Sequence, residues 1–412
     1  MIPRRRYDIE ENLFGIIASS ILSKMFVKGE EVAQFEQTFS DILSSKSRHE
    51  MYSTATSSGR EALVKLLMAL RVPKDQKIMI PSYTLGALVP FLHKNGFECK
   101  VCDVDKAYPV ITAEEFEKQL TTDVSCVLLT HLFGYIGEIE DICEIAKAHN
   151  VLVIEDCAHC LGSSYYEYMP GTFGDGALFS FDILKTVNTF GGGMAVTRHE
   201  NVAKQIVQLE KNEKAPSHFE VLKKIGSGLT EEMTLATPLL KLPTGMLAFE
   251  ETRPLIDFVD RKLRRPASSN SVYKCYSNVQ AQCGLSQIKT LEDRVQKKRY
   301  IAKRILDTLE IEDKQINGNS YKQSNAYYLV VKAAEGENAS LIRKELWFKG
   351  IDAGYGNEIA DDIGGIVGGK YQNSADWFLR GIQLPCYSSM SDETLNELLS
   401  KLQGFMGRLV KD

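Results

Sequence analysis

A lysine that follows a short apolar run is the residue in this sequence best suited to act as a nucleophile. Lys185 comes shortly after ALFSF (177–181), which carries a hydroxyl at Ser180, and three glycines follow at 191–193. An amine is nucleophilic when partial desolvation keeps it neutral, so this setting suits formation of a Schiff base. A lone lysine is more often solvated, so its chemistry depends on what surrounds it.

A carboxylate and an imidazole follow a second apolar run. Residues 151–155 (VLVIE) lead into Asp156, and His159 lies three positions further on. A carboxylate at the end of such a run can hold the protonated ring nitrogen of a bound heterocyclic ligand, and the histidine can lie beside the same ring. The alternative is a structural role, in which Asp156 caps a helix and His159 makes its hydrogen bonds inside the protein. Cys157 and Cys160 form a C-x-x-C pair without a second ligand pair, which is a weak zinc signal, so we expect no metal site.

Hydroxylated and small residues precede a strongly helical run. Ser57, Ser58, Gly59 and Arg60 stand at the start of REALVKLLMAL (60–70). Hydroxyls, a glycine and free N–H groups at a helix N-terminus form an anion-binding site. An ordinary N-cap explains the same residues, so this segment alone leaves both interpretations open.

One cofactor requires all three segments in this order. Pyridoxal 5'-phosphate needs an anion cradle, a carboxylate at its pyridine nitrogen and a lysine amine for its Schiff base. Asp156 precedes Lys185 by 29 residues, which leaves room for one helix or loop and one strand. The combination therefore favours a pyridoxal-phosphate protein more strongly than any segment does alone.

The pattern around these segments predicts an α/β fold. Apolar strands alternate with helices between residues 50 and 200, which indicates a mainly parallel sheet covered on both faces, with ligands beyond the carboxyl ends of the strands. We expect a large domain over residues 1–200, a connecting excursion over 200–270 and a small domain over 271–412. The expected strands are 77–80, 99–104, 125–130, 151–155, 177–181, 194–197 and 326–331, and the expected helices include 60–70, 141–149, 340–349 and 392–402.

The overall composition excludes several other classes of protein. Forty-nine Lys and Arg against 54 Asp and Glu give a net charge of −5, and the basic cluster Arg4–Arg6 is too short for a nucleic-acid-binding tail. No apolar run reaches the length of a membrane span, and we expect no secretory signal, because no apolar run follows the arginines. Nine scattered cysteines suit a reducing cytoplasm. We expect the apolar stretch Leu239–Phe249 to pack on the protein, with a partner surface or membrane contact as the alternatives.

The central segments resemble a known family. The run EDCAHCLGSSY, followed by GTFGDGALFSFDILKTVNTFGGGMAVT, is similar to the core of the sugar aminotransferases of the DegT/DnrJ/EryC/StrS type. The likeness continues upstream in SSGREAL and THLFGYIGEIED and downstream in NVQAQCGLSQIKTLEDRV. It implies a fold type I pyridoxal-phosphate transferase, with a large mainly parallel-sheet domain, a small C-terminal α+β domain, and an active site at the interface of a cytoplasmic homodimer.

The resemblance also implies a role for each matching residue. Lys185 would form the Schiff base and then act as general base and acid, and Asp156 would pair with the ring nitrogen. His159 falls near the ring oxygen, Ser180 at the phosphate, and Ser58, Gly59 and Arg60 at the phosphate-binding turn. The implied reaction moves an amino group from L-glutamate to a keto sugar, nucleotide-linked in much of the family, in sugar and polysaccharide biosynthesis. A lysine at 185 argues against the dehydratase branch, which has histidine there.

Three positions depart from the family pattern. Arg60 replaces a small residue, and Leu85 stands where an aromatic side chain commonly stacks on the cofactor ring. Tyr273 aligns with an asparagine that reaches the neighbouring subunit's cofactor. Two alternatives share the same residues: another pyridoxal-phosphate reaction, such as elimination or carbon–carbon cleavage, and a non-catalytic binding or regulatory protein that keeps the fold.

Overall fold

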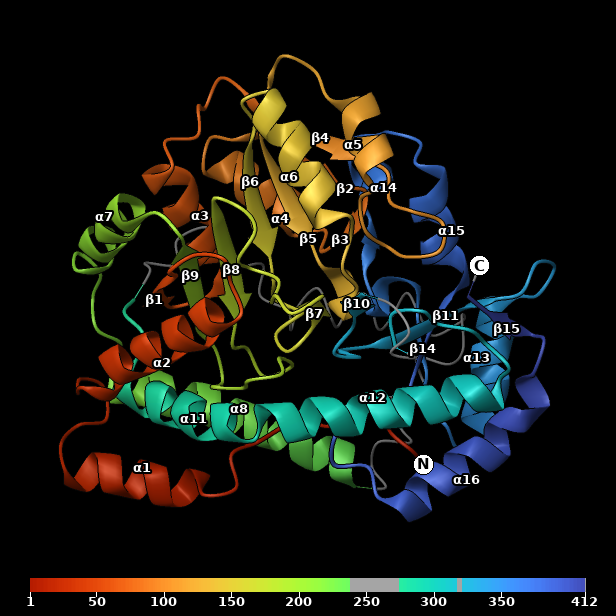
Figure 1. Ribbon diagram of the computed structural model, residues 1–412. Coiled ribbons are helices and arrows are strands. Elements are labelled where there is room, and N and C mark those ends of the chain that lie inside the picture. Colours follow the sequence, from red (N-terminus) through yellow and green to blue (C-terminus); the bar gives the residue numbers. More distant parts are fainter. Residues whose placement is uncertain (238–273, 317–320, 412) are drawn as a thin grey trace.

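The computed structural model describes residues 1–237, 274–316 and 321–411. Its largest element is a seven-stranded sheet in the order β1-β9-β8-β6-β5-β2-β4 (Figure 1). The four neighbouring pairs from β8 to β4 are parallel, whereas β8 with β9 and β1 with β9 are antiparallel. This confirms the predicted mainly parallel sheet. The strands are β1 (Tyr52–Thr56), β2 (Lys77–Pro81), β4 (Glu98–Cys102), β5 (Val124–Thr130), β6 (Leu152–Asp156), β8 (Gly176–Ser180) and β9 (Gly193–Thr197).

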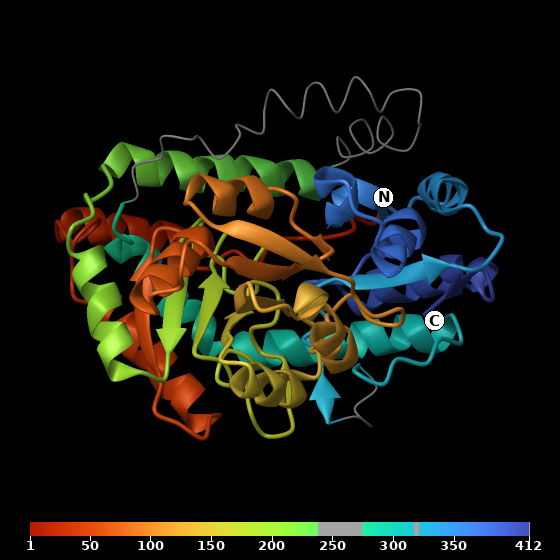
Figure 2. The same ribbon diagram turned by 90° about the horizontal axis from the view of Figure 1, so that it is seen from above.

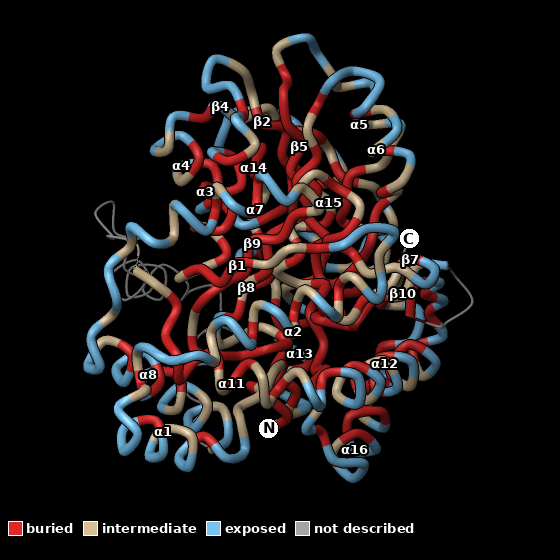
Figure 3. The backbone as a smooth tube through the Cα atoms, turned by 60° about the vertical axis from the view of Figure 1, so that its left-hand side comes forward, coloured by how far each residue is buried: buried red, intermediate tan, exposed pale blue. Residues whose placement is uncertain are grey.

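Helices cover both faces of this sheet because successive strand side chains point in opposite directions. Leu128 and Ile154 pack into one apolar cluster with helix α3 (Gly59–Ala69). Val127 and Val153 pack into another with helix α6 (Ile139–Ala148). Figure 3 shows the strands between them as a largely buried layer. Further helices of this part are α1 (Leu13–Leu22), α2 (Glu31–Ser45), α4 (Leu88–Lys94), α5 (Ala113–Gln119), α7 (Glu200–Glu210) and α11 (Asn278–Lys289).

The C-terminal part forms a second, smaller sheet. Its four strands run in the order β12-β14-β11-β15, all antiparallel, and its apolar cluster is separate from those of the large sheet. Helix α12 (Leu291–Thr308) runs along both parts in Figure 1. The strands are β11 (Leu329–Ala333), β12 (Gly354–Tyr355), β14 (Gly381–Leu384) and β15 (Leu409–Val410), and the helices are α13 (Ala339–Phe348), α14 (Ile363–Val367), α15 (Gln372–Arg380) and α16 (Asp392–Leu402).

Strand β11 begins later than the sequence predicts. The expected strand started at Ala326, but Ala326 has a φ of 51° and the Asn325 side chain accepts a hydrogen bond from the Tyr327 N–H at 3.0 Å. The local turn therefore delays the strand to Leu329. Two short antiparallel pairings lie outside these sheets: β3 (Tyr83–Thr84) with β13 (Asp361–Asp362), and β7 (Ser164–Tyr165) with β10 (Lys322–Gln323). Isolated bridges occur as well.

The predicted excursion begins as two helices. Helix α7 is followed by α8 (His218–Ala236), which starts with a capping box made by Ser217 and Glu220. In Figure 2, α8 lies along one side of the large sheet, at the start of the grey trace. The stretch Leu239–Phe249 lies outside the described residues. No helix in the described ranges has both the length and the apolar character that crossing a membrane requires.

A buried glutamate fixes the loop that follows β6. Glu155 is fully buried, and its carboxylate accepts hydrogen bonds from the Gly171, Phe173 and Gly174 N–H groups at 2.6–2.9 Å. His131 Nε2 lies 3.2 Å from the same carboxylate. Glu155, His131 and Cys157 lie close enough for a metal site, but the carboxylate already has these four partners. Their arrangement is that of a structural anchor beside Asp156.

Replacing this anchor is expected to destabilise the protein. Glu155→Ala leaves three backbone N–H groups without a partner in a dry interior, so unfolding in urea should require about 3 kcal/mol less free energy. Glu140→Ala is the matched control, because Glu140 and its partner Arg48 are partly exposed and such a pair contributes about 0–1 kcal/mol. Equal urea midpoints for the two variants would contradict the anchoring role.

Candidate functional site

The predicted site residues meet in one cavity of about 860 Å³. It lies beyond the carboxyl ends of β6 and β8, where parallel sheets place ligands. Six of the seven predicted residues line it: Ser58, Gly59, Arg60, Asp156, Ser180 and Lys185. The seventh, His159, lies just outside the lining. Three segments that are distant in the sequence therefore supply one site, as the order of the motifs predicted.

The N-terminus of α3 forms one wall of the cavity. Ser58 is its N-cap and accepts a hydrogen bond from the Glu61 N–H at 3.2 Å. A Cβ on Gly59 would come within 3.2 Å of the Ser180 Cβ, and one on Gly193 would collide with the Gly59 backbone nitrogen. These glycines allow the helix end, β8 and β9 to meet closely. The N-cap and anion-site interpretations are compatible, because the capped helix end faces the cavity.

Asp156 is the last residue of β6 and keeps its carboxylate at the cavity. The carboxylate accepts a hydrogen bond from the Ala158 N–H at 3.0 Å. Burial raises the pKa of Asp156, and the nearby Lys185 and His131 act in the opposite direction. A partly desolvated carboxylate is a strong partner for a protonated ring nitrogen.

The Lys185 amine lies in the same cavity and is poised to be neutral. Burial lowers its pKa from the ordinary 10.5 to about 8, although the charges of Asp156 and Asp182 raise it. Its Nζ lies 5.3 Å from the centre of the Tyr327 ring. A lysine with such a pKa has a substantial neutral fraction near physiological pH and can act as nucleophile or base.

His159 lies near this amine, in a stack of rings. Its imidazole packs on Tyr327 with centroids 4.1 Å apart and planes 15° from parallel, and its Nδ1 accepts a hydrogen bond from the Phe133 N–H at 3.4 Å. Burial and the charges of Lys185 and Lys298 lower the pKa of His159 well below its ordinary value. The imidazole is therefore neutral. Its predicted contact with a cofactor ring remains a prediction.

Two of the three positions that depart from the family pattern, Leu85 and Arg60, lie among the described residues. Leu85 lines the cavity with 55% of its surface exposed. The Arg60 guanidinium lies 6.0 Å from the Phe91 ring centre.

Tyr273, the third departing position, lies outside the described residues. Tyr276, three residues further on, is buried, and its hydroxyl donates a hydrogen bond to Thr189 Oγ1 at 2.7 Å, which supports the glycine turn at 191–193. Phe190 is the aromatic residue among the described residues that line the cavity.

Helix α8 contributes side chains that the sequence interpretation missed. Lys223 and Lys224 line the cavity, and a Cβ on Gly191 would lie 3.4 Å from the Lys224 Nζ. Lys274 lines it too and pairs with Glu220 of α8. Lys223 and Lys224 fall in the segment 200–270, which the sequence suggested to be only a connection, and Lys274 follows it. None of the three was predicted, because no motif marks a helix that reaches back over the sheet.

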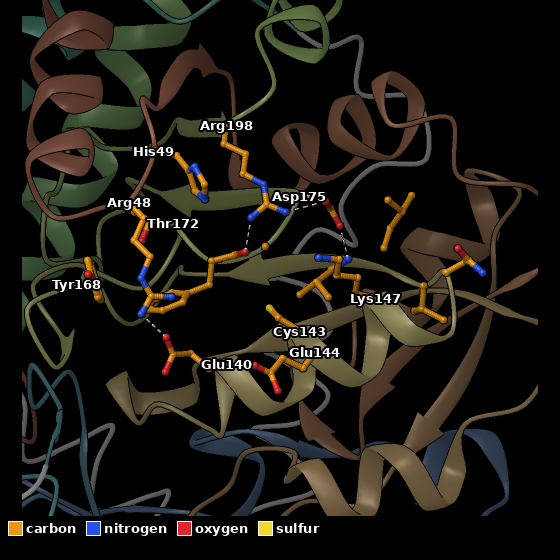
Figure 4. A pocket seen from close by; sticks show the side chains of 16 residues that line it. Arg48, His49, Glu140, Cys143, Glu144, Lys147, Tyr168, Thr172, Asp175 and Arg198 are labelled. Atoms are coloured by element: carbon orange, nitrogen blue, oxygen red, sulfur yellow. Dashed lines mark hydrogen bonds and ion pairs between the residues drawn. The ribbon is translucent and has the colours of Figure 1, made fainter.

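A second cleft, of about 850 Å³, lies at the other end of β6 (Figure 4). Its charges balance: three cations, Arg48, Lys147 and Arg198, face three carboxylates, Glu140, Glu144 and Asp175. Two of these pairs are direct, Arg48 with Glu140 at 2.6 Å and Arg198 with Asp175 at 3.2 Å. The pKa of its thiol, Cys143, is raised by burial to about 12. The candidate site is therefore the cavity that holds Lys185.

The groups in this cavity fit pyridoxal phosphate. A helix N-terminus with the Ser180 hydroxyl suits its phosphate, a half-buried Asp156 with little internal pairing suits its ring nitrogen, and a neutral amine suits its aldehyde. The residues present thus supply each of the three contacts that the cofactor requires.

The lowered pKa of Lys185 can be measured on the cofactor-free protein. A neutral amine reacts with an acylating reagent and a protonated one does not, so labelling of Lys185 should rise through pH 8 and then level off. Mass spectrometry of the labelled peptide follows the rate as a function of pH. A rate that keeps rising up to pH 10 or above would contradict a desolvated amine.

Comparisons with known proteins identify relatives of this chain. A model of the DegT/DnrJ/EryC1/StrS aminotransferase family matches residues 8–234 and 273–403. GDP-perosamine synthase of Escherichia coli O157:H7 is 33% identical over 175 residues, 42% of this chain and 47% of that protein. The dTDP-3-amino-3,6-dideoxy-alpha-D-galactopyranose transaminase of Aneurinibacillus thermoaerophilus is 27% identical over 220 residues, 53% and 59% of the two chains. The matched part thus spans about half the length of these relatives.

Solved structures of aminotransferases share the whole fold. The aminotransferase from Psychrobacter cryohalolentis superposes with a TM-score of 0.75 at 19% identity over 98% of both chains. A Helicobacter pylori aminotransferase involved in the biosynthesis of pseudoaminic acid superposes with a TM-score of 0.74 at 15% identity, over 98% of this chain and 99% of its own. These likenesses confirm the predicted fold type I architecture. With the family model matching most of its length, this chain belongs to the DegT/DnrJ/EryC1/StrS aminotransferase family, which confirms the family predicted from its sequence.

Proposed function

We propose that this protein transfers an amino group from L-glutamate to the keto group of a nucleotide-linked sugar, with Lys185 as its reacting amine. The observation that carries the proposal is the meeting of a desolvated Lys185 amine, the Asp156 carboxylate and the α3 N-terminus in one cavity. Pyridoxal phosphate, when bound, supplies an electron sink for the carbanion at the amino-bearing carbon. The residues of the chain then bind, orient and move protons.

Each residue has a distinct part in this proposal. The N–H groups of Gly59 and Arg60, with the hydroxyls of Ser58 and Ser180, would hold the phosphate. Asp156 would keep the ring nitrogen protonated, and His159, neutral in its stack, would lie beside the ring. Lys185 would join the cofactor aldehyde in the resting protein. Once displaced by the donor, its amine would carry the proton from the substrate carbon to the cofactor.

A nucleotide-linked acceptor is supported by two observations. The relatives described above are a GDP-perosamine synthase and a dTDP-amino sugar transaminase. Lys223 and Lys224 of α8 line the same cavity as Lys185 and provide positive charge for a diphosphate. The amino sugar formed would enter polysaccharide biosynthesis.

We also propose that the protein works as a homodimer in the cytoplasm. Leu85 exposes 55% of an apolar side chain at the cavity, where a second subunit would cover it. All nine cysteines carry free thiols, which suits a reducing compartment. Sedimentation equilibrium of the holoprotein should give twice the 46.2 kDa of the chain, and a monomer would refute the dimer.

Glutamate should convert the bound cofactor in a half-reaction without any acceptor. We expect its aldehyde absorbance to give way to that of the aminated form, and a keto sugar nucleotide to reverse the change. Lys185→Ala should bind the cofactor without a covalent bond and should be inactive, because it lacks both nucleophile and base. Absence of conversion by the wild type with any amino acid would favour elimination or carbon–carbon cleavage.

Removing the charge of Asp156 should slow the same half-reaction while leaving the cofactor attached. Asp156→Asn cannot hold the ring nitrogen protonated, so the rate should fall by about 10²-fold or more, a size typical of a lost electrostatic partner. Asp182→Asn is the control, since Asp182 also lies near Lys185 but has no contact with the ring in this proposal. Equal rates in the two variants would contradict the role of Asp156.

A further inference from the structure

The three arginines near the N-terminus have different surroundings, although they are consecutive. Arg4 is buried and pairs with Asp352 at 2.6 Å and with Glu358. Arg6 pairs with Glu232 of α8, whose carboxylate also accepts a hydrogen bond from the Tyr7 N–H. The flanking arginines therefore fix this segment to the C-terminal part on one side and to α8 on the other, and Arg5 is held between them.

Among the described residues, Arg5 has no comparable partner. Its Nη1 lies 3.5 Å from the Tyr328 hydroxyl, and the nearest carboxylate among the described residues, Glu231, lies 3.9 Å from its Nη2. The side chain of Glu231 is 49% exposed and already accepts a hydrogen bond from the Tyr7 hydroxyl. An ion pair so long and so exposed contributes little to stability, so the Arg5 guanidinium is available to bind another anion.

Arg5 lines a small pocket together with the reacting lysine. The pocket measures about 30 Å³ and is separate from the large cavity. Lys185, Tyr327 and Cys386 are among the residues that share its wall. A pocket of this size holds about two water molecules, or the two oxygens of one carboxylate.

The pocket also contains a buried amine, that of Lys298. Lys298 Nζ donates a hydrogen bond to the Tyr327 carbonyl at 3.3 Å, and in the described part of the chain no carboxylate lies within ion-pair distance of it. Burial lowers its pKa. The carboxylate of Asp8 also lines the pocket, but it pairs with Arg294 at 3.1 Å and accepts a hydrogen bond from Ser388. The pocket thus has an excess of positive charge that an anion would balance.

We propose that this pocket binds the α-carboxylate of the amino acid donor, with Arg5 as its principal ligand and Lys298 as a second. The inference rests on the proposed function. The carbon that reacts must lie beside the Lys185 Nζ, and the α-carboxylate is the group bonded directly to that carbon. A pocket of about 30 Å³ accepts a carboxylate but not the rest of the donor, whose side chain would extend into the large cavity.

The test compares donors and variants in the half-reaction of the holoprotein. Arg5→Gln should raise the glutamate concentration needed for half-maximal rate by about tenfold or more, since a bidentate charged contact is lost, while the maximal rate changes far less. Arg5→Lys should recover part of the loss, because it keeps the charge without the fork. Arg6→Gln is the control for the docking of the segment, since Arg6 lines the same pocket but its guanidinium is engaged by Glu232.

The donor itself provides a second measurement that needs no variant. The wild type should use glutamine, which has a γ-amide, in preference to isoglutamine, which has an α-amide, and Arg5→Gln should reduce that preference. Three results would each overturn this assignment without touching the proposed function. They are an unchanged half-saturating glutamate concentration in Arg5→Gln, an equal rise of that concentration in Arg6→Gln, and equal rates of the wild type with glutamine and isoglutamine. A wild type that reacts with no amino acid would overturn the proposed function as well.

Discussion

The proposed chemistry of this protein depends on shielding one lysine amine from water beside one carboxylate. Burial favours the neutral form of Lys185 and the protonated form of Asp156, whereas their mutual attraction favours both charges. For Lys185 burial outweighs the attraction, which leaves a pKa of about 8. An amine as exposed as an ordinary surface lysine would stay protonated and unreactive, so the surrounding fold must exclude water while leaving the amine accessible to small molecules.

The architecture meets this requirement by placing short segments at one edge of a parallel sheet. β6 ends in Asp156, β8 ends in Ser180, and the N-terminus of α3 meets them where glycines permit close approach. Glu155, one residue before Asp156, holds the next loop through three backbone N–H groups. The interior of the sheet thus fixes the chain immediately beside each reacting group. Tyr327, from the C-terminal part, closes the site beneath Lys185 and His159.

The sequence predicted those features that short segments encode. The parallel strands were identifiable from apolar runs, and the site residues from the chemical types at their ends. The antiparallel β1, the lining side chains of α8 and the ring stack of His159 on Tyr327 were not predicted, because each depends on contacts between distant segments. Arg4–Arg6 is the clearest case. As a sequence it is a short basic cluster, and only the positions of Asp352 and Glu232 give its three members different surroundings.

The central claim is that Lys185 is the amine joined to the cofactor. Borohydride reduction of the holoprotein fixes any Schiff base as a stable secondary amine, and peptide mass spectrometry then locates it. The account predicts one adduct, on the peptide that contains Lys185, and none in Lys185→Ala. An adduct on Lys224 or Lys298, which line the same cavity and the adjoining pocket, or no adduct in the wild type, would contradict it.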